Sequence, residues 1–287
     1  MKSDTGRETV LGVERNDKEL KIRIGGQPVD SARALVEALP ILLVHPESHR
    51  LVAEGPAHRR QFLDWGVFHV EPTFHAIWNR YRKALNQRNA VLKQGLSVGQ
   101  LGPWEKEMEE AATALDLLRK KYMEELGPHF LRLGSELLEG QEVLLHYRRG
   151  WPESVKLSVV LQETREGDRK LGYTRYGPHR ADLTLLLGRD RAVTVASRGQ
   201  QKLLLLSLIL AQAELLSQRR SQKRPILLID DLPSELDASR LNKVLKVLDS
   251  LQYQTFVTGT ERSMFPPEIV ECSRTFHVEH GRIEPMV

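Results

Sequence analysis

Two adjacent aspartates, Asp230 and Asp231, directly follow the apolar run Ile226–Ile229. Such a run is typical of a strand buried on both faces of a parallel sheet, and ligands of these sheets bind beyond the carboxyl ends of the strands. Adjacent carboxylates repel each other, and a bound Mg²⁺ with nucleotide phosphates would relieve that repulsion. We therefore predict that Asp230 holds Mg²⁺ and that Asp231 polarises an attacking water. On these residues alone, an aspartate pair that caps a turn explains the pattern equally well.

A second segment, Ser197-Arg198-Gly199-Gln200, precedes the acidic pair and opens an apolar helix predicted over 199–217. A hydroxyl, free backbone N–H groups and a glycine at a helix N-terminus suit a terminal phosphate. Ordinary capping by Ser197 is the stronger explanation when the segment is taken alone. With the acidic pair downstream, the two segments are typical of the signature and Walker B motifs of an ABC-type ATPase.

Residues after the acidic pair fit the same kind of ATPase. Ser234-Glu235-Leu236-Asp237 stands at the position of the D-loop, which crosses the dimer interface. Asp237 also fits as the N-cap of a helix predicted over 239–251, and both roles can hold at once. Either Thr258 or Thr260 stands where such ATPases place the switch residue, and the sequence does not choose between them.

These motifs need a sheet and helices to position them. The predicted helices cover 73–94, 104–126, 129–139, 199–217 and 239–251, and the predicted strands cover 8–15, 18–24, 143–147, 155–162, 181–187, 192–195, 226–229, 255–258 and 275–278. The alternation of strands and helices near the end predicts a parallel sheet with helices outside.

We divide the chain into four parts. The first, 1–72, is the β-rich remainder of a first lobe, and 73–139 is a helical lobe. Strands and the motif helix occupy 140–224, and 225–287 carries the acidic pair.

Composition limits the possible partners and compartment. The 287 residues carry 42 Lys and Arg against 38 Asp and Glu, a net charge of +4 that permits a polyanionic partner without proving one. The single cysteine, Cys272, excludes an internal disulfide and indicates a reducing, cytoplasmic compartment. The longest apolar stretch, 203–211, is too short to span a bilayer, so we expect no membrane association.

Basic residues gather on the helix predicted over 73–94, and they are Arg80, Arg82, Lys83 and Arg88. We predict that they form a ridge facing DNA, where cationic side chains meet phosphates without reading the base sequence. A solvated helix face explains the same residues and is the stronger alternative.

Three further blocks extend the pattern beyond a generic ATPase. They are His45-Pro46-Glu47 with Leu51-Val52, Gly55-Pro56, Arg59-Arg60 and Phe62-Leu63-Asp64-Trp65; Gln87-Arg88-Asn89; and Gly177-Pro178-His179-Arg180 with Asp182. Together with the ATPase motifs they resemble the RecF family of bacterial repair ATPases, related to SMC proteins, from about residue 10 to the end. An SMC or transporter head fits less well, and the helices within 73–126 are too short for an SMC arm.

The resemblance implies an α/β fold: an ABC-type ATPase head with a mixed or parallel sheet lobe and a helical second lobe. It implies an ATP-controlled DNA-binding protein of recombinational gap repair, replication-fork maintenance and the SOS response. ATP and Mg²⁺ are the implied cofactors. DNA, a second copy of the chain, and RecR-like and RecO-like proteins are the implied partners, and in the dimer Ser197–Gln200 would face the partner's nucleotide.

The sequence departs from the family in two places. No Gly-x-x-x-x-Gly-Lys-Ser/Thr stretch occurs in it, whereas the family's phosphate-binding loop lies upstream of the hairpin with which this chain begins. We therefore expect an N-terminally truncated relative that does not hydrolyse ATP by itself. A non-catalytic module that binds DNA or a partner, and a non-productive fragment, are the alternatives. Ala181 also stands where the family usually has an acidic residue.

One geometric expectation follows from the dimer. The signature segment should serve the partner subunit, so Ser197–Gln200 should face Asp230 and Asp231 only across a gap. The acidic pair itself should lie at the end of a central strand.

Overall fold

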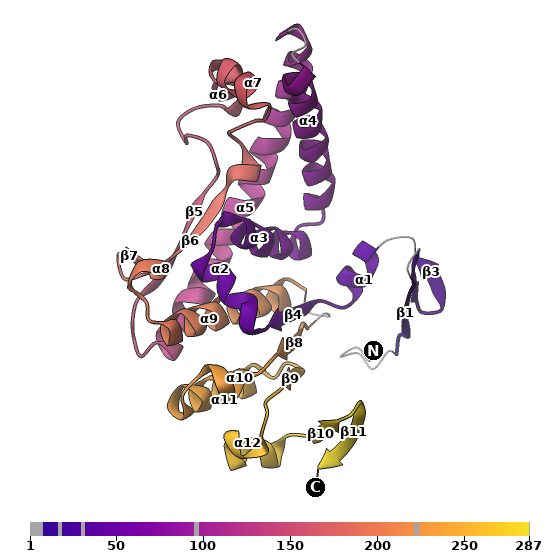
Figure 1. Ribbon diagram of the computed structural model, residues 1–287, viewed down its shortest axis with the longest axis vertical. Coiled ribbons are helices and arrows are strands. Elements are labelled where there is room, and N and C mark those ends of the chain that lie inside the picture. The colour runs from indigo at the N-terminus through magenta and orange to yellow at the C-terminus, as the bar shows by residue number, and fades with distance from the viewer. Residues whose placement is uncertain (1–7, 17–18, 30–31, 95–97, 221–223, 287) are drawn as a thin grey trace.

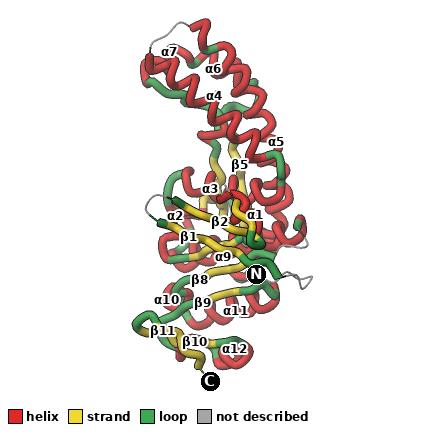
Figure 2. The backbone as a smooth tube through the Cα atoms, turned by 90° about the vertical axis from the view of Figure 1, so that its right-hand side faces the viewer, coloured by secondary structure: helices red, strands yellow, loops and turns green. Residues whose placement is uncertain are grey.

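A computed structural model describes residues 8–16, 19–29, 32–94, 98–220 and 224–286. A long helical arm rises from a base that holds small sheets and shorter helices (Figures 1 and 2). No helix within these ranges is both long and apolar enough to cross a membrane.

The arm is a helical hairpin of α4 (Phe74–Gln94) and α5 (Gly102–Leu137). Its tip is covered by α6 (Leu157–Glu163) and α7 (Arg165–Leu171), as Figure 1 shows. Phe74, Tyr81 and Leu92 are buried on one face of α4, which is the helical periodicity that the sequence predicts.

The prediction that the second arm helix stops at Gly127-Pro128 is wrong, because α5 continues through Pro128 to Leu137. A proline inside a helix removes one backbone hydrogen bond and costs about 3 kcal/mol. The continued helix packs along α9 (Arg198–Arg219) and buries Leu126, Phe130 and Leu133 completely. Burial of each large apolar side chain stabilises by about 1.5–3 kcal/mol, so packing outweighs the proline.

A parallel sheet forms the centre of the base, in the order β4 (Ile41–Val44), β8 (Ile226–Ile229) and β9 (Thr255–Val257). Strand β8 is therefore the central strand, as expected, and its last residue pairs with the ends of both neighbours. Helix α11 (Ala238–Leu251), which follows β8, turns a buried apolar face toward the core. The acidic pair thus leaves the middle of the sheet at its carboxyl edge.

The other sheets are antiparallel. The remaining elements of the fold are β1 (Leu11–Arg15), β2 (Leu20–Ile24), β3 (Gln27–Val29), α1 (Ala32–Ala38), η1 (Pro46–His49), α2 (Arg50–Ala53), α3 (Pro56–Val70), η2 (Val98–Gln100), β5 (Val143–Arg148), η3 (Pro178–Arg180), β6 (Asp182–Leu187), β7 (Asp190–Arg191), α8 (Ala192–Val195), α10 (Leu232–Glu235), η4 (Arg262–Met264), α12 (Pro267–Cys272), β10 (Thr275–Glu279) and β11 (Arg282–Met286).

Two predicted strands are helices. Residues 155–162 contain most of α6, where Leu157, Val160 and Leu161 are buried at helical spacing. Residues 192–195 form the single turn α8. An alternating apolar pattern suggested the first strand and a preceding turn at Gly188-Arg189-Asp190 suggested the second, and the structure forms helical turns at both places.

The predicted last strand, 275–278, is the first half of a hairpin whose second strand, β11, the sequence analysis missed. His280 and Gly281 both have positive φ, 47° and 76°, which suits the two-residue turn of a hairpin. Gly281 was the residue in the sequence that could have predicted this turn and the strand after it.

Candidate nucleotide site and charged surfaces

The acidic pair is tied to the neighbouring strand β9 by one threonine. The Thr258 hydroxyl donates a hydrogen bond to Asp230 Oδ1 over 2.6 Å and accepts one from the Asp231 amide over 2.9 Å. Thr260 instead has its hydroxyl 3.4 Å from Met264 Sδ. The structure thus distinguishes the two threonines that the sequence left equal: Thr258 holds the Asp230 carboxylate and the Asp231 amide, and its role as the switch residue stays a prediction.

Asp231 has an unusual backbone and an unsatisfied side chain. Its φ and ψ are 53° and 38°, the left-handed region that costs a non-glycine residue about 1–2 kcal/mol. The Ser234 hydroxyl donates to Asp231 Oδ2 over 2.5 Å, while Asp231 Oδ1 is buried without a hydrogen-bond partner. Strain and an unpaired polar atom at one residue indicate a functional position.

The acidic pair has no cationic side chain as an ion-pair partner among the residues that the structure describes. In the same described part, no group of three or more His, Cys, Asp or Glu forms a protein-only metal cage. Mg²⁺ bound with a nucleotide typically takes one or two carboxylates and completes its shell with phosphates and water. The two carboxylates therefore fit a Mg²⁺–nucleotide group.

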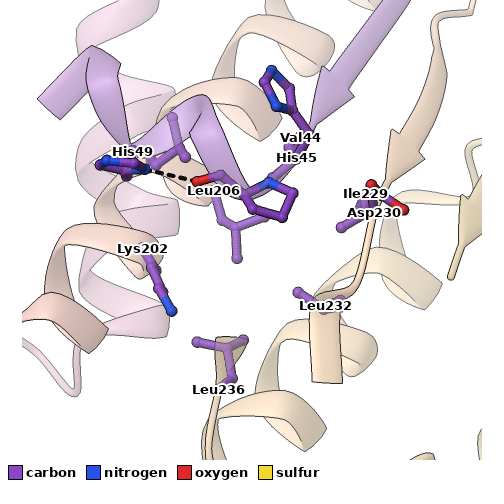
Figure 3. A pocket seen from close by; sticks show the side chains of 11 residues that line it. Val44, His45, His49, Lys202, Leu206, Ile229, Asp230, Leu232 and Leu236 are labelled. Atoms are coloured by element: carbon purple, nitrogen blue, oxygen red, sulfur yellow. Dashed lines mark hydrogen bonds between the residues drawn. The ribbon is translucent and has the colours of Figure 1, made fainter. Parts of the chain in front are cut away.

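A pocket opens beside Asp230, between the carboxyl ends of β4 and β8 and the first turns of α9 (Figure 3). The side chains of Lys202 and Asp230 lie on opposite walls. The rest of the lining is Val44, His45, Pro46, His49, Leu205, Leu206, Ile229, Leu232 and Leu236. The pocket joins the start of the signature helix to the acidic strand end.

The signature segment is a well-formed helix start. The Ser197 hydroxyl accepts from the Gln200 amide over 3.3 Å, and Gln200 Oε1 accepts from the Ser197 amide over 2.8 Å, which makes a capping box. Arg198 is exposed. A methyl group at Gly199 would lie 2.5 Å from Arg240 Nη1, so the guanidinium of α11 rests against this glycine. Capping is thus present, and the phosphate role of the segment stays a prediction.

No hydrogen bond joins Ser197 to Asp230, both of which lie in the described part of the chain. Lys202, about one turn further along α9, shares the pocket with Asp230. The outcome that would contradict the prediction, a hydrogen bond from Ser197 to Asp230, is absent from the described residues, and the gap itself and its reason, service to a partner subunit, stay predictions. Asp237 caps α11 by accepting from the Arg240 amide over 2.9 Å, as predicted, and its place in a dimer interface is untested.

Arg88 corrects the predicted DNA-facing ridge. Its side chain is 0% exposed and donates to Glu105, Asp168 and Thr174 over 3.2, 2.9 and 2.8 Å. An arginine enclosed in this way does not meet phosphates at the surface. It faces inward because it lies on the same side of α4 as Tyr81 and Leu92.

The other three residues of the predicted DNA-facing ridge, Arg80, Arg82 and Lys83, are exposed. Arg80 forms ion pairs with Glu107 over 2.7 Å and with Glu110 over 3.5 Å, both on α5. Arg82 and Lys83 form no ion pair within the described ranges. The solvated-face alternative therefore describes Arg80 well.

The sequence blocks shared with the family meet where the arm joins the base. Arg59 pairs with Asp182 over 2.8 Å. Arg119, which the sequence analysis did not single out, pairs with Asp64 over 2.7 Å and donates to the Pro178 carbonyl over 3.0 Å. The joint is thus held by charges that lie far apart in the sequence.

His179 is a neutral histidine in this joint. Its Nδ1 is 2.6 Å from the Tyr81 hydroxyl and its Nε2 is 3.0 Å from the Thr174 carbonyl. Burial, with smaller contributions from the nearby Arg180 and Arg60, lowers the pKa of His179 from 6.5 to about 4, against the raising effects of the Thr174 hydrogen bond and of Asp168. At neutral pH the ring is uncharged and holds the loop against α4.

Comparison with known proteins identifies the family of the chain. The RecF/RecN/SMC N terminal domain family matches residues 3–284. The DNA replication and repair protein RecF of Pseudomonas fluorescens (strain Pf0-1) is 43% identical over 282 residues, 97% of this chain and 77% of that protein. RecF of Pseudomonas syringae pv. syringae (strain B728a) is 44% identical over 283 residues, with the same coverage of both chains.

Solved structures show the same fold. The recombination mediator protein RecF–ATP of the RecFOR pathway superimposes with a TM-score of 0.85 at 23% identity, over 100% of this chain and 78% of that one. The structure of the recombination mediator protein RecF-ATPrS of the same pathway gives a TM-score of 0.84 at 22% identity. The α/β head with a parallel sheet and a helical lobe is therefore the RecF fold, and the chain belongs to the RecF family.

Proposed function

We propose that this protein is an ATP-controlled DNA-binding protein of recombinational gap repair and replication-fork maintenance, acting as a dimer that encloses ATP between its subunits. The observation that carries the proposal is the acidic pair, which ends the central strand without a cationic partner in the described residues. Relatives at over 40% identity that are called DNA replication and repair proteins support it.

Each residue of the site has a part in this proposal. Asp230, held by Thr258, would hold Mg²⁺ directly or through water, and Asp231 would polarise the attacking water as its general base. Bound Mg²⁺ with ATP supplies the charge neutralisation that phosphoryl transfer needs.

The partner subunit completes the site. Ser197, Arg198, Gly199 and Gln200 offer a hydroxyl, a guanidinium and helix N-terminal amides to the nucleotide of the other subunit. Ser234 and Asp237 lie on the loop that crosses between subunits. DNA, a second copy of the chain, and RecR-like and RecO-like proteins are the proposed partners, in the cytoplasm.

A second candidate function is non-catalytic binding of DNA or a repair partner. It is favoured by one observation: these 287 residues contain no Gly-x-x-x-x-Gly-Lys-Ser/Thr stretch. A lost transition-state donor costs about 2.7–4 kcal/mol, and a phosphate loop supplies several such donors. For the 287-residue protein we therefore expect no phosphate release above an Asp230→Ala control, measured with Mg²⁺, ATP and DNA. Release that disappears in Asp230→Ala would show that other residues replace the loop.

The catalytic proposal is tested in a chain extended by the N-terminal segment of a RecF relative. There, Asp231→Asn should reduce hydrolysis by about 10²–10⁴-fold, because general-base catalysis is worth that much. Dimerisation with ATP, measured by light scattering, should persist. An unchanged turnover would move the base to another residue.

A further inference from the structure

The segment 169–181 runs from the last residues of α7 through η3 to the start of β6, and basic and aromatic residues are frequent in it. It contains no Asp or Glu and holds Arg169, Lys170, Arg175 and Arg180, with Tyr173 and Tyr176 between them. Basic residues alternating with aromatic ones are typical of surfaces that bind single-stranded nucleic acid. The acidic residues Asp168 and Asp182 stand directly outside the segment.

Contacts place four side chains along one path, which we call the basic ridge: Lys93, Tyr173, Arg180 and Arg60. A methyl group at Gly172 would lie 3.3 Å from Lys93 Cγ, so Lys93 adjoins the residue before Tyr173. The Arg180 guanidinium lies 5.3 Å from the centre of the Tyr173 ring. Arg60 Nη1 donates to the carbonyl of Ala181, the neighbour of Arg180, over 2.9 Å.

The length of the ridge follows from helix α4. Its lower part is fixed by the hydrogen bond between His179 and Tyr81, and its upper end is Lys93. Between Tyr81 and Lys93 the helix rises by about 18 Å at 1.5 Å per residue. Nucleotides of one strand in B-DNA follow each other at about 3.4 Å, so the ridge is as long as about five of them.

The acids near the ridge are already neutralised. Asp168 pairs with Arg88 and Arg175, both at 2.9 Å or less, and Asp182 pairs with Arg59 at 2.8 Å. Asp64 is held by Arg119 at 2.7 Å. The exposed Glu163 and Glu166 of α6 and α7 form no ion pair with the ridge cations.

The three ridge cations therefore represent uncompensated positive charge. Lys93, Arg180 and Arg60 form no ion pair with any acid of the described chain. Burial, followed by repulsion from Arg119, lowers the pKa of Arg60, and nearby Asp182 and Asp64 only partly oppose this. An anion beside Arg60 and Arg180 would relieve the repulsion.

We propose that the basic ridge binds one DNA strand: Lys93, Arg180 and Arg60 contact its phosphates, and Tyr173 stacks on an unpaired base. This inference rests on the proposed function and names the surface by which it reaches DNA. Tyr173 is 40% exposed, and the cation over its ring leaves exposed ring surface for a base. The surface differs from the predicted one, which included the buried Arg88 and the paired Arg80.

The test is fluorescence anisotropy of the 287-residue protein with a labelled single-stranded oligonucleotide and with the corresponding duplex, over a range of salt. In the triple variant Lys93→Gln, Arg180→Gln and Arg60→Gln, the slope of log K against log salt on the single strand should fall by about 2, at about 0.7 per lost contact. Tyr173→Leu should weaken single-strand binding by about tenfold, because stacking contributes about 1–3 kcal/mol per base, and it should leave duplex binding within about twofold.

The control variant Arg189→Gln, Lys246→Gln and Arg274→Gln removes the same charge from exposed residues elsewhere and should keep the wild-type slope. Because Arg60 supports the joint, the double variant Lys93→Gln and Arg180→Gln serves as a second measure, with an expected loss of about 1.4 in slope.

Two results would contradict DNA binding by the basic ridge and leave the proposed function standing. One is an equal slope of log K against log salt for the triple variant and its control, and the other is unchanged single-strand affinity in Tyr173→Leu. A wild-type protein that binds neither oligonucleotide would overturn the proposed function itself.

Discussion

Charges are handled in opposite ways at the carboxyl end of β8 and at the joint between arm and base. At the joint and in the arm above it, Arg88, Asp168 and Asp182 are almost completely buried, and each has an ion-pair partner. At the strand end, Asp230 and Asp231 adjoin each other and have no ion-pair partner in the described part of the chain, and one oxygen of Asp231 is buried there without a hydrogen-bond partner.

The difference separates structural from functional charge. Breaking a buried ion pair leaves an uncompensated charge, so paired networks fix geometry and tolerate no loss. Adjacent carboxylates without a cation repel each other, and a bound cation would relieve that repulsion. Unpaired charge, rather than charge itself, therefore marks the candidate nucleotide site here, and the same criterion selected the basic ridge.

The largest effect is expected from Arg88→Met. The change leaves Glu105 and Asp168 short of a buried cationic partner, and truncating one member of such a network typically costs about 3–5 kcal/mol. Urea denaturation at neutral pH measures the loss. Arg82→Met, at an exposed position of the same helix, should stay within about 0.5 kcal/mol of wild type. Equal stability of the two variants would contradict the distinction between structural and functional charge, because the ion pairs of Arg88 would then not stabilise the fold.

A somewhat smaller effect is expected from the titration of His179. Its pKa is about 4 in the folded chain and 6.5 otherwise, so the unfolded chain takes up the proton first as the pH falls. The stability due to the neutral ring is complete above pH 6.5 and is lost between pH 6.5 and 4, by up to about 3 kcal/mol. His179→Gln should lose less stability over this interval, measured by thermal unfolding at several pH values. Parallel pH profiles would show that His179 does not titrate with folding.

The smallest effect is expected at the carboxyl end of β8, the second of the two regions compared. Asp231→Asn removes a like charge beside Asp230, and asparagine tolerates the left-handed conformation, so we expect stability to rise by about 1 kcal/mol or less. Millimolar Mg²⁺ should raise the melting temperature of wild type more than that of the variant. A loss above about 1 kcal/mol would mean that Asp231 is a structural residue like Arg88.

Local patterns were sufficient for much of the fold. Strand β8, helix α9 and helix α11 lie close to their predicted bounds because each has an uninterrupted apolar pattern and, for the helices, a side-chain cap at Ser197 or Asp237. The predictions failed at Pro128 and in α6, where contacts with distant helices outweighed local preference. The candidate site followed the same rule: the sequence named Asp230 and Asp231, and long-range contact selected Thr258 over Thr260.

The sequence alone determined the family, and it predicted the acidic pair and the signature segment, because each depends on residue type and spacing within a short stretch. Tertiary structure decided which charges are available. Arg88 and Arg82 lie on one helix and look equivalent in the sequence, yet Arg88 is enclosed by α5, α7 and the loop at Thr174, while Arg82 is exposed. The reason is physical: the energy of a charge depends on its surroundings, and these come from segments distant in the chain.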